Sequence, residues 1–256
     1  MPKVRMGLIT ADEQIPFHLR DHNGMGAVEK YIVDAKPDIR VRLGDMLDMN
    51  ALQGWTRMSP EGVEWDEIRD EIAIANDMMD RQDAKLPAHC EKHFWMGNHE
   101  ERLMKFRHKN RFSAYWIKNK TTIPYLIRDL KLKERGYKVH PQNDAHPFGK
   151  LYMFHGDNYS TWHTQKNVLA YEANLVYGHV HSPQRFTKVG RIDKSPKSAW
   201  SIGCLCSTNP EWKNGGPNAW VSGFAIFYLQ DNGLFNLYPV DMSKGSFVAP
   251  NGKLYK

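Results

Sequence analysis

An α/β fold with mixed β-sheets is the class that this 256-residue sequence predicts. Short apolar runs alternate with helical patterns early in the chain, which favours parallel strands, and alternating segments near the end favour antiparallel strands. A hydrophobic content of 41% and a charged content of 25% are ordinary for a globular protein with a sizeable core. One domain over 1–256 is the simplest organisation, because no repeat, low-complexity tract or long linker interrupts the pattern.

Strands are expected where apolar runs are short, and helices where apolar residues recur at helical spacing. Proline marks the end of two helices, at Pro37 and Pro87. The expected strands are 4–10, 39–43, 93–96, 137–140, 151–154, 174–177, 199–205, 221–229 and 234–240. The expected helices are 26–35, 65–85, 101–116 and 125–130.

The net charge and the cysteine content narrow the range of possible binding partners and of cellular compartments. The net charge of +6 and the pI near 9.1 favour polyanionic partners. The mean hydropathy is −0.62, and no apolar run approaches the roughly 20 residues of a membrane span, so no membrane partner is expected. Cys90, Cys204 and Cys206 form an odd set without a CxxC pair, which favours a reducing, cytoplasmic compartment.

Polar side chains follow five of the expected strands at the point where each strand ends. In sheets of this kind, ligands bind beyond the carboxyl ends of the strands. Each of these side chains alone is an ordinary loop residue, but together they bring carboxylate, amide and imidazole groups to one edge, which suits Mn, Fe or Zn. The potential ligands are Asp12, Asp45, Asn98, His155, His179 and His181.

The order of these motifs resembles the calcineurin-like metallophosphoesterase superfamily over residues 12–181. The motifs are D-x-Q at 12–14, GDMLD at 44–48, GNHE at 97–100, HGD at 155–157 and GHVH at 178–181. The resemblance implies a four-layer α/β/β/α sandwich with two mixed β-sheets. It also implies a phosphoric ester hydrolase with two divalent metal ions, for which Mn is favoured and Fe, Zn, Ni or Mg are possible.

The resemblance further implies a role for each motif residue. The first metal would be held by Asp12, Gln14, Asp45 and His181. The second metal would be held by Asp45 as a bridge, Asn98, His155 and His179. His99 would face the substrate phosphate or protonate the leaving oxygen, with Asp48 orienting it. Two such ions polarise a phosphoryl oxygen and lower the pKa of a bridging water, which gives a hydroxide for in-line attack.

The first motif departs from the family pattern. Family members usually carry D-x-H there, whereas this chain has Gln14 in place of the histidine. An amide is a weaker donor than imidazole to late transition metals. We therefore expect the first metal to be bound less tightly or to be an oxygen-preferring ion such as Mn. His18 and His22 are alternative ligands, although both lie further along the chain.

The substrate class is narrowed by two methionines. Met49 and Met96 stand where the Ser/Thr protein phosphatase branch carries arginines that clamp the phosphate. Arginine is favoured for bidentate phosphate recognition, so this difference argues for a phosphodiesterase acting on DNA, RNA or a nucleotide. Basic and aromatic residues alternate over 102–120 and could follow a nucleic-acid strand, although a solvated helix face is the alternative. The candidate substrate contacts are Arg102, Lys105 and Arg107.

Two other functions stay open. A phosphomonoesterase acting on proteins or nucleotides is the first, and an inactive metal-binding module that recruits a partner is the second. His99 and Asp48 favour an enzyme over the inactive module. Among phosphodiesterases, a small nuclease or a nucleotide phosphodiesterase is expected, because the segment after Val240 is too short for the capping domain that exonuclease members carry.

Overall fold

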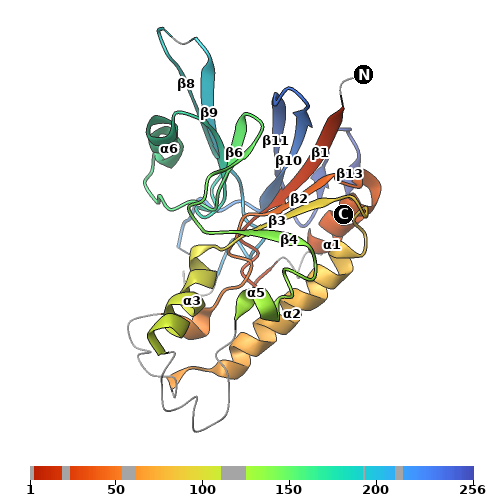
Figure 1. The fold of residues 1–256 in the computed structure, drawn as a ribbon, viewed down its shortest axis with the longest axis vertical. Coiled ribbons are helices and arrows are strands. Elements are labelled where there is room, and N and C mark those ends of the chain that lie inside the picture. The colour runs from red at the N-terminus through yellow and green to blue at the C-terminus, as the bar shows by residue number, and fades with distance from the viewer. Residues whose placement is uncertain (1–2, 19–23, 54–61, 111–124, 193, 211–215) are drawn as a thin grey trace.

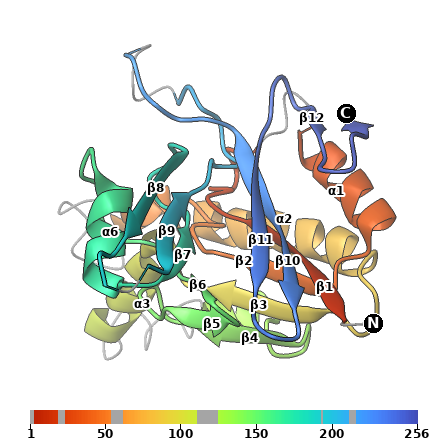
Figure 2. The ribbon, with the colours of Figure 1, turned by 90° about the horizontal axis from the view of Figure 1, so that it is seen from above.

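Two β-sheets pack face to face, with helices on their outer sides (Figure 1, Figure 2). A computed structural model describes residues 3–18, 24–53, 62–110, 125–192, 194–210 and 216–256. Both sheets are mixed, which confirms the predicted fold class. Within these ranges, every helix is too short or too polar to cross a membrane.

The larger sheet has six strands in the order β11-β10-β1-β2-β3-β4. Strands β1 to β4 are parallel neighbours, whereas β10 runs antiparallel to both β1 and β11. The strands are β1 (Val4–Thr10), β2 (Ile39–Arg42), β3 (Glu91–Trp95), β4 (Tyr137–His140), β10 (Gly223–Gln230) and β11 (Phe235–Asp241). The parallel strands therefore come from the early part of the chain and the antiparallel ones from its end, as the patterns predict.

The smaller sheet has five strands in the order β5-β6-β7-β9-β8. Its central strands β6, β7 and β9 are parallel, and β5 and β8 run antiparallel at its edges. The strands are β5 (His146–Phe148), β6 (Leu151–Met153), β7 (Asn174–Tyr177), β8 (Gln184–Val189) and β9 (Pro196–Ser201). Two short strands, β12 (Phe247–Val248) and β13 (Leu254–Tyr255), form a separate pair.

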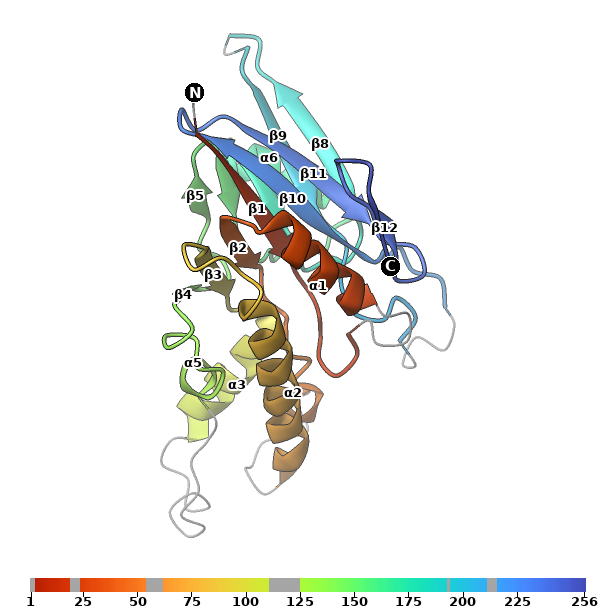
Figure 3. The ribbon, with the colours of Figure 1, turned by 90° about the vertical axis from the view of Figure 1, so that its right-hand side faces the viewer.

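Helices form the outer layers of the sandwich. The larger sheet is covered by α1 (Gly24–Ala35) and α2 (Trp65–Asp83), and the smaller sheet by α6 (His163–Tyr171) (Figure 1, Figure 3). The remaining helices are η1 (Asn50–Leu52), α3 (Asn98–Asn110) and α5 (Leu126–Asp129). The order helix, sheet, sheet, helix is the expected four-layer arrangement, with a single helix in the fourth layer of the described residues.

Alternation along the strands separates two apolar cores. Leu8 and Phe94 belong to the core that the larger sheet shares with α1 and α2. Ile9 and Trp95, each next in sequence, pack between the two sheets with Val176 of β7. Successive side chains of a strand point to opposite faces, so these parallel strands are apolar on both faces because both are covered.

Two buried arginines interrupt the apolar pattern of β2. Arg40 and Arg42 are fully buried, and both donate hydrogen bonds to Oε1 of Gln82 in α2, at 3.3 and 2.9 Å. Arg42 also forms an ion pair at 3.3 Å with the buried carboxylate of Glu13. A buried charge without a partner is costly, so this network holds Glu13 in place, and with it the neighbouring Asp12.

Several element bounds differ from the sequence prediction. Strands β5 and β8 and helix α6 are additional elements, because their short stretches carry little apolar periodicity. The expected strand 199–205 ends at Ser201, and Cys204 and Cys206 form isolated bridges with other segments. Helix α3 begins at Asn98 instead of 101, and 111–116 lie outside the described residues. Most other expected elements agree within two residues.

Gly7 of β1 packs closely against the core between the two sheets. It pairs with Phe227 of β10, and a Cβ atom on Gly7 would lie 2.0 Å from a carbon of that fully buried ring. Overpacking of this kind costs about 1–3 kcal/mol. We therefore expect urea unfolding of Gly7→Ala to show a loss of that size. Gly62→Ala is the control, because a Cβ there meets nothing within 4 Å; equal losses in both variants would contradict this packing.

Candidate metal centre

The predicted metal ligands lie together at the carboxyl edge of the parallel strands. They follow β1, β2 and β3 of the larger sheet and β6 and β7 of the smaller one, so both sheets contribute. We call these residues the candidate metal centre: Asp12, Gln14, Asp45, Asn98, His155, His179 and His181. The carboxylates and imidazoles are buried, whereas Gln14 and Asn98 are half-buried and lie on the more open side.

His155 joins the ligands that were assigned to the second metal. Its Nε2 atom lies 3.2 Å from Oδ2 of Asp45, 3.1 Å from Oδ1 of Asn98 and 3.2 Å from Nδ1 of His179. Its Nδ1 donates to the carbonyl of Leu43 at 2.6 Å, which directs Nε2 toward the other ligands. Burial opposes protonation of His155, but the Asp45 carboxylate raises its pKa to about 9. This side of the centre therefore attracts a cation strongly.

His181 and Asp12 form the core of the first metal site. Nε2 of His181 lies 3.3 Å from Oδ1 of Asp12. Burial opposes protonation of His181, but Asp12 raises its pKa to about 10. The amide nitrogen of Gln14 lies 3.5 Å from the same Nε2 and 3.4 Å from Nε2 of His99. A half-turn of that amide places its oxygen in the same position, so Gln14 is within reach of this site as an oxygen ligand.

The backbone of the candidate metal centre is in the left-handed region at several non-glycine residues. The φ angles are 56° at Asp12, 42° at Gln14, 51° at Asp45, 71° at His179 and 61° at His181. Such conformations are uncommon for residues with a Cβ and cluster at functional sites. Backbone hydrogen bonds from Asp12 to Gly44 at 3.0 Å and from Gln14 to Asp45 at 2.9 Å hold two of these loops together.

Two motif glycines let the carboxylates approach the backbone closely. A Cβ on Gly97 would lie 2.1 Å from Oδ1 of Asp45, and one on Gly178 would lie 2.5 Å from Oδ2 of Asp12. A backbone N–H one or two residues after each glycine completes the anchor. The backbone N–H of His99 donates to Oδ1 of Asp45, and that of His179 donates to Oδ2 of Asp12, both at 2.9 Å. Each carboxylate is thus fixed through one oxygen and turns the other toward the ligands.

Two buried atoms of the centre lack hydrogen-bond partners among the described residues. They are Oδ1 of Asp12 and Nε2 of His179. Buried polar atoms are normally satisfied, so such atoms within a group of carboxylates and imidazoles fit a bound cation. Ligand atoms of Asp45, His155 and His179 also lie within 4.8 Å of one another. The donor set and its unsatisfied atoms therefore fit divalent metal ions.

The imidazole of His99 faces the candidate metal centre from the first turn of α3. Its Nδ1 donates to the carbonyl of Asp48 at 2.6 Å, whereas the Asp48 carboxylate is 3.5 Å away. Asp48 therefore orients His99 chiefly through its backbone. Nε2 of His99 accepts a hydrogen bond from Arg102 at 3.1 Å and lies 3.7 Å from Oδ2 of Asp45. Burial opposes protonation of His99, but the carboxylates of Asp45 and Asp48 together raise its pKa.

Comparisons with known proteins found similar solved structures. No protein-family model matches the sequence, and no curated protein matches it either. Three similar solved structures are a dimetal phosphatase from Danio rerio, the phosphoesterase Yfce from E. coli and a predicted phosphoesterase from Streptococcus pneumoniae TIGR4. In that order, their sequence identities to this chain are 11%, 14% and 12%, and their TM-scores are 0.40, 0.36 and 0.36. The alignments cover 95%, 91% and 100% of this chain and 100%, 98% and 100% of the matched chains.

This chain resembles a calcineurin-like metallophosphoesterase. The likeness consists of the ordered motifs and of the way their side chains converge. Among the metallophosphoesterase motifs, GNHE also contains Glu100, to which the sequence assigned no role. Glu100 is fully buried and accepts backbone N–H bonds from Asp45, Leu47 and Gly97 at 2.9, 3.0 and 2.8 Å. It therefore ties the GDMLD loop to the start of α3.

The three residues predicted to contact the substrate have different neighbours in the structure. Arg102 contacts two motif residues, His99 and the carbonyl of Asp48. Lys105 pairs with Glu101 at 2.6 Å, and the guanidinium of Arg107 lies 4.8 Å from the centre of the Tyr125 ring. The rest of the basic stretch, 111–120, and the alternative ligand His22 lie outside the described residues. The other alternative, His18, is buried, and its backbone pairs with Cys206.

Several neighbours of the ligands come from segments that the motifs do not include. The ring of Tyr159 lies 4.1 Å from that of His179, and the ring of Trp220 lies 4.2 Å from that of His181. Sγ of Cys206 is 3.8 Å from Nδ1 of His181, on the side of the ring away from Asp12. No sequence signal marks these contacts, because they depend on how separate loops meet.

Glu100 and Glu101 provide a matched pair for a stability test. Glu100→Gln leaves one oxygen to serve three backbone donors, so at least one buried N–H loses its partner. We expect the free energy of unfolding to fall by about 1–3 kcal/mol in urea titrations. Glu101→Gln removes only a surface ion pair with Lys105 and should change it by less than about 1 kcal/mol. A Glu100→Gln variant as stable as Glu101→Gln would show that the three hydrogen bonds contribute little.

Proposed function

We propose that this protein is a dinuclear metal-dependent phosphoesterase. The observation that carries the proposal is the convergence, at one buried edge, of carboxylate, amide and imidazole atoms with two of them unsatisfied among the described residues. When bound there, two divalent ions would polarise a phosphoryl oxygen and activate a water molecule for in-line attack. Mn suits the oxygen-rich first site best, because Gln14 supplies an amide in place of an imidazole.

Two overlapping sets of ligands would hold the two ions. The first metal would be held by Asp12, Gln14, Asp45 and His181. The second would be held by Asp45, Asn98, His155 and His179. Asp45 would belong to both sets as the resemblance implies, with Oδ2, which lies 3.2 Å from Nε2 of His155, as its free oxygen and Oδ1 anchored to the backbone. An imidazole must be deprotonated to bind a metal ion. Asp12 favours a proton on His181, and Asp45 favours one on His155. Metal binding would displace both protons.

His99 and Arg102 are the groups that would act on the phosphate. The bond from Nδ1 of His99 to the Asp48 carbonyl leaves Nε2 as the atom that holds or delivers a proton at the leaving oxygen. Arg102 now donates to that Nε2. A phosphate entering beside His99 would attract the guanidinium, and Nε2 would then be free to carry the proton.

Two features support a phosphodiester in a nucleic acid or nucleotide as the substrate. Met49 and Met96, which replace the clamp arginines, are both buried in the apolar core, so Arg102 is the one arginine that contacts His99 among the described residues. A single arginine suits the lower charge of a diester better than that of a monoester. Tyr159, whose ring lies over His179, is 68% exposed, and the nearby Trp162 is 66% exposed, which suits stacking against bases.

Replacement of His99 tests the proposed acid. We expect His99→Asn to lower the turnover of a bis-nitrophenyl phosphate in Mn by a factor of about 10²–10⁴, with the bound Mn unchanged. His108→Asn is the control, because it removes an exposed histidine from the same helix. Undiminished hydrolysis by His99→Asn would remove this mechanism, whereas loss of Mn from the variant would show that His99 acts on the metals instead.

The substrate class is tested by comparing esters under the same conditions. We expect faster Mn-dependent turnover of the bis-nitrophenyl ester than of the mono-nitrophenyl ester, followed by activity on DNA, RNA or a cyclic nucleotide in a panel that includes a phosphopeptide. Asp45→Asn should abolish every activity and so serves as the background control. Faster turnover of the monoester would favour a phosphomonoesterase. Metal binding without any turnover would favour the inactive module.

A further inference from the structure

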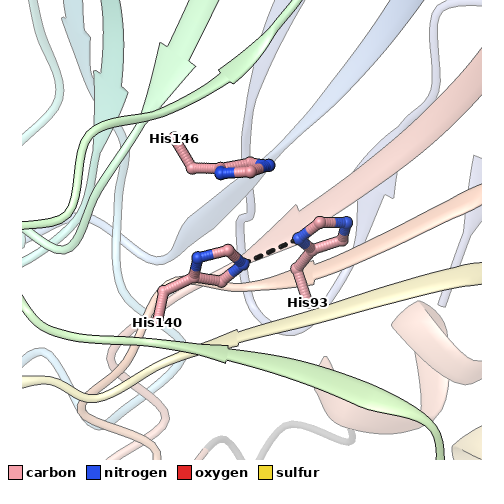
Figure 4. A group of neighbouring side chains, drawn as sticks. All are labelled: His93, His140 and His146. Carbon is pink, nitrogen blue, oxygen red and sulfur yellow. Dashed lines mark hydrogen bonds between the residues drawn. The ribbon is translucent and has the colours of Figure 1, made fainter.

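Three histidines outside the candidate metal centre gather where the two sheets meet. His93 lies in β3, His140 at the end of β4 and His146 at the start of β5, and Figure 4 shows their rings grouped together. One ring nitrogen of each lies within 4.8 Å of the others. We call them the three-histidine cluster. Because β3 and β4 belong to the larger sheet and β5 to the smaller, the cluster bridges the two sheets.

The far nitrogen of His93 is held by a carboxylate. Nε2 of His93 lies 3.1 Å from Oε1 of Glu91. The same carboxylate accepts hydrogen bonds from Lys138 at 2.6 Å and Arg5 at 3.0 Å. Burial opposes ionisation of Glu91, but these partners lower its pKa to about 2, so it acts only as an acceptor. The hydrogen of a neutral His93 ring is therefore on Nε2, and its Nδ1 is bare.

His140 is also held by a carboxylate, but through its Nδ1 atom instead of Nε2. Its Nδ1 lies 2.9 Å from Oδ2 of Asp144, a carboxylate that is 45% exposed. The hydrogen of a neutral His140 ring is therefore on Nδ1, and its Nε2 is bare. The two bare nitrogens, Nδ1 of His93 and Nε2 of His140, face each other at 2.9 Å (Figure 4). Two lone pairs at this distance repel each other unless a cation lies between them.

A proton is a poor candidate for that cation. His93 is fully buried and His140 is 7% exposed, and the His140 ring stacks on Trp95 with centroids 4.1 Å apart. Burial lowers the pKa of His140, and it lowers that of His93 to about 4. A metal ion can use the same two lone pairs and also that of His146, the half-buried member of the cluster.

We propose that His93, His140 and His146 bind a zinc ion that links the two β-sheets. Imidazole nitrogen is a preferred zinc ligand, and a carboxylate on the opposite ring nitrogen is the usual way to orient a zinc-binding histidine. Ligand nitrogens of a tetrahedral zinc site are about 3.3 Å apart. The facing nitrogens of His93 and His140 are 2.9 Å apart, so they must separate by a few tenths of an ångström, and both rings must turn so that their lone pairs converge on the ion instead of pointing at each other.

Removal of His146 tests the site without disturbing its buried members. Protein dialysed against zinc and then against metal-free buffer is analysed for bound zinc by mass spectrometry. We expect His146→Ala to hold one equivalent fewer than the unaltered protein. His89→Ala is the control and should lose none, because His89 is a 69% exposed histidine paired with Asp38 outside the cluster. Equal zinc content in His146→Ala and the unaltered protein would overturn the proposal.

Thermal unfolding separates metal binding from a packing effect. With EDTA present, we expect the same Tm for His146→Ala and the unaltered protein, and added zinc should raise the Tm of the unaltered protein further than that of His146→Ala, in which only the candidate metal centre is left to bind it. An equal zinc-induced rise in the two proteins that disappears in Asp45→Asn would overturn the proposal, because it would assign the whole effect to the candidate metal centre. The Mn-dependent turnover should be unchanged in His146→Ala. Failure of the phosphoesterase proposal would leave the one-equivalent difference intact, so the two are distinguishable.

Discussion

Burial of the carboxylates of Asp12 and Asp45 is the constraint on which the rest of the centre depends. Neither is exposed by more than 1%, and burial of an ionised carboxylate is costly unless it is paired. Each is anchored through one oxygen by a backbone N–H one or two residues after a glycine, which leaves the other oxygen to interact with imidazoles. The raised pKa values of His155 and His181 are a direct consequence of that negative charge. A pair of divalent ions satisfies the same requirement and suits phosphoester chemistry.

The surrounding fold is organised so that these two carboxylates can be buried close together. Left-handed backbone at Asp12 and Asp45 would be unfavourable in isolation, but hydrogen bonds between their loops hold it. Beneath one loop, the ion pair of Arg42 with Glu13 fixes the chain next to Asp12. Beneath the other, Glu100 accepts the backbone N–H of Asp45. The interior of the larger sheet and the start of α3 therefore act as rigid supports for the centre.

The two histidine groups differ in where their carboxylates lie. In the candidate metal centre, Asp12 and Asp45 lie beside the imidazole nitrogens that face inward, so the carboxylates themselves would be ligands. In the three-histidine cluster, Glu91 contacts the outward-facing nitrogen of His93 and leaves the inward lone pair bare. The first arrangement gives an anionic, oxygen-rich site that suits activation of water. The second gives a neutral nitrogen site that suits a single zinc ion with a structural role.

The fold class, most of the strand ends and the candidate ligands could be predicted from the sequence alone. Those features are local: the apolar period sets each strand, and a polar motif directly after a strand must lie at its carboxyl edge. The residues that surround the candidate ligands depend on the tertiary structure. Arg102 reaches His99 while Lys105 does not, and Cys206 lies against His181, because helix rotation and loop packing set these contacts. The three-histidine cluster has the same origin, since its members meet only when the edges of two separate sheets are brought together.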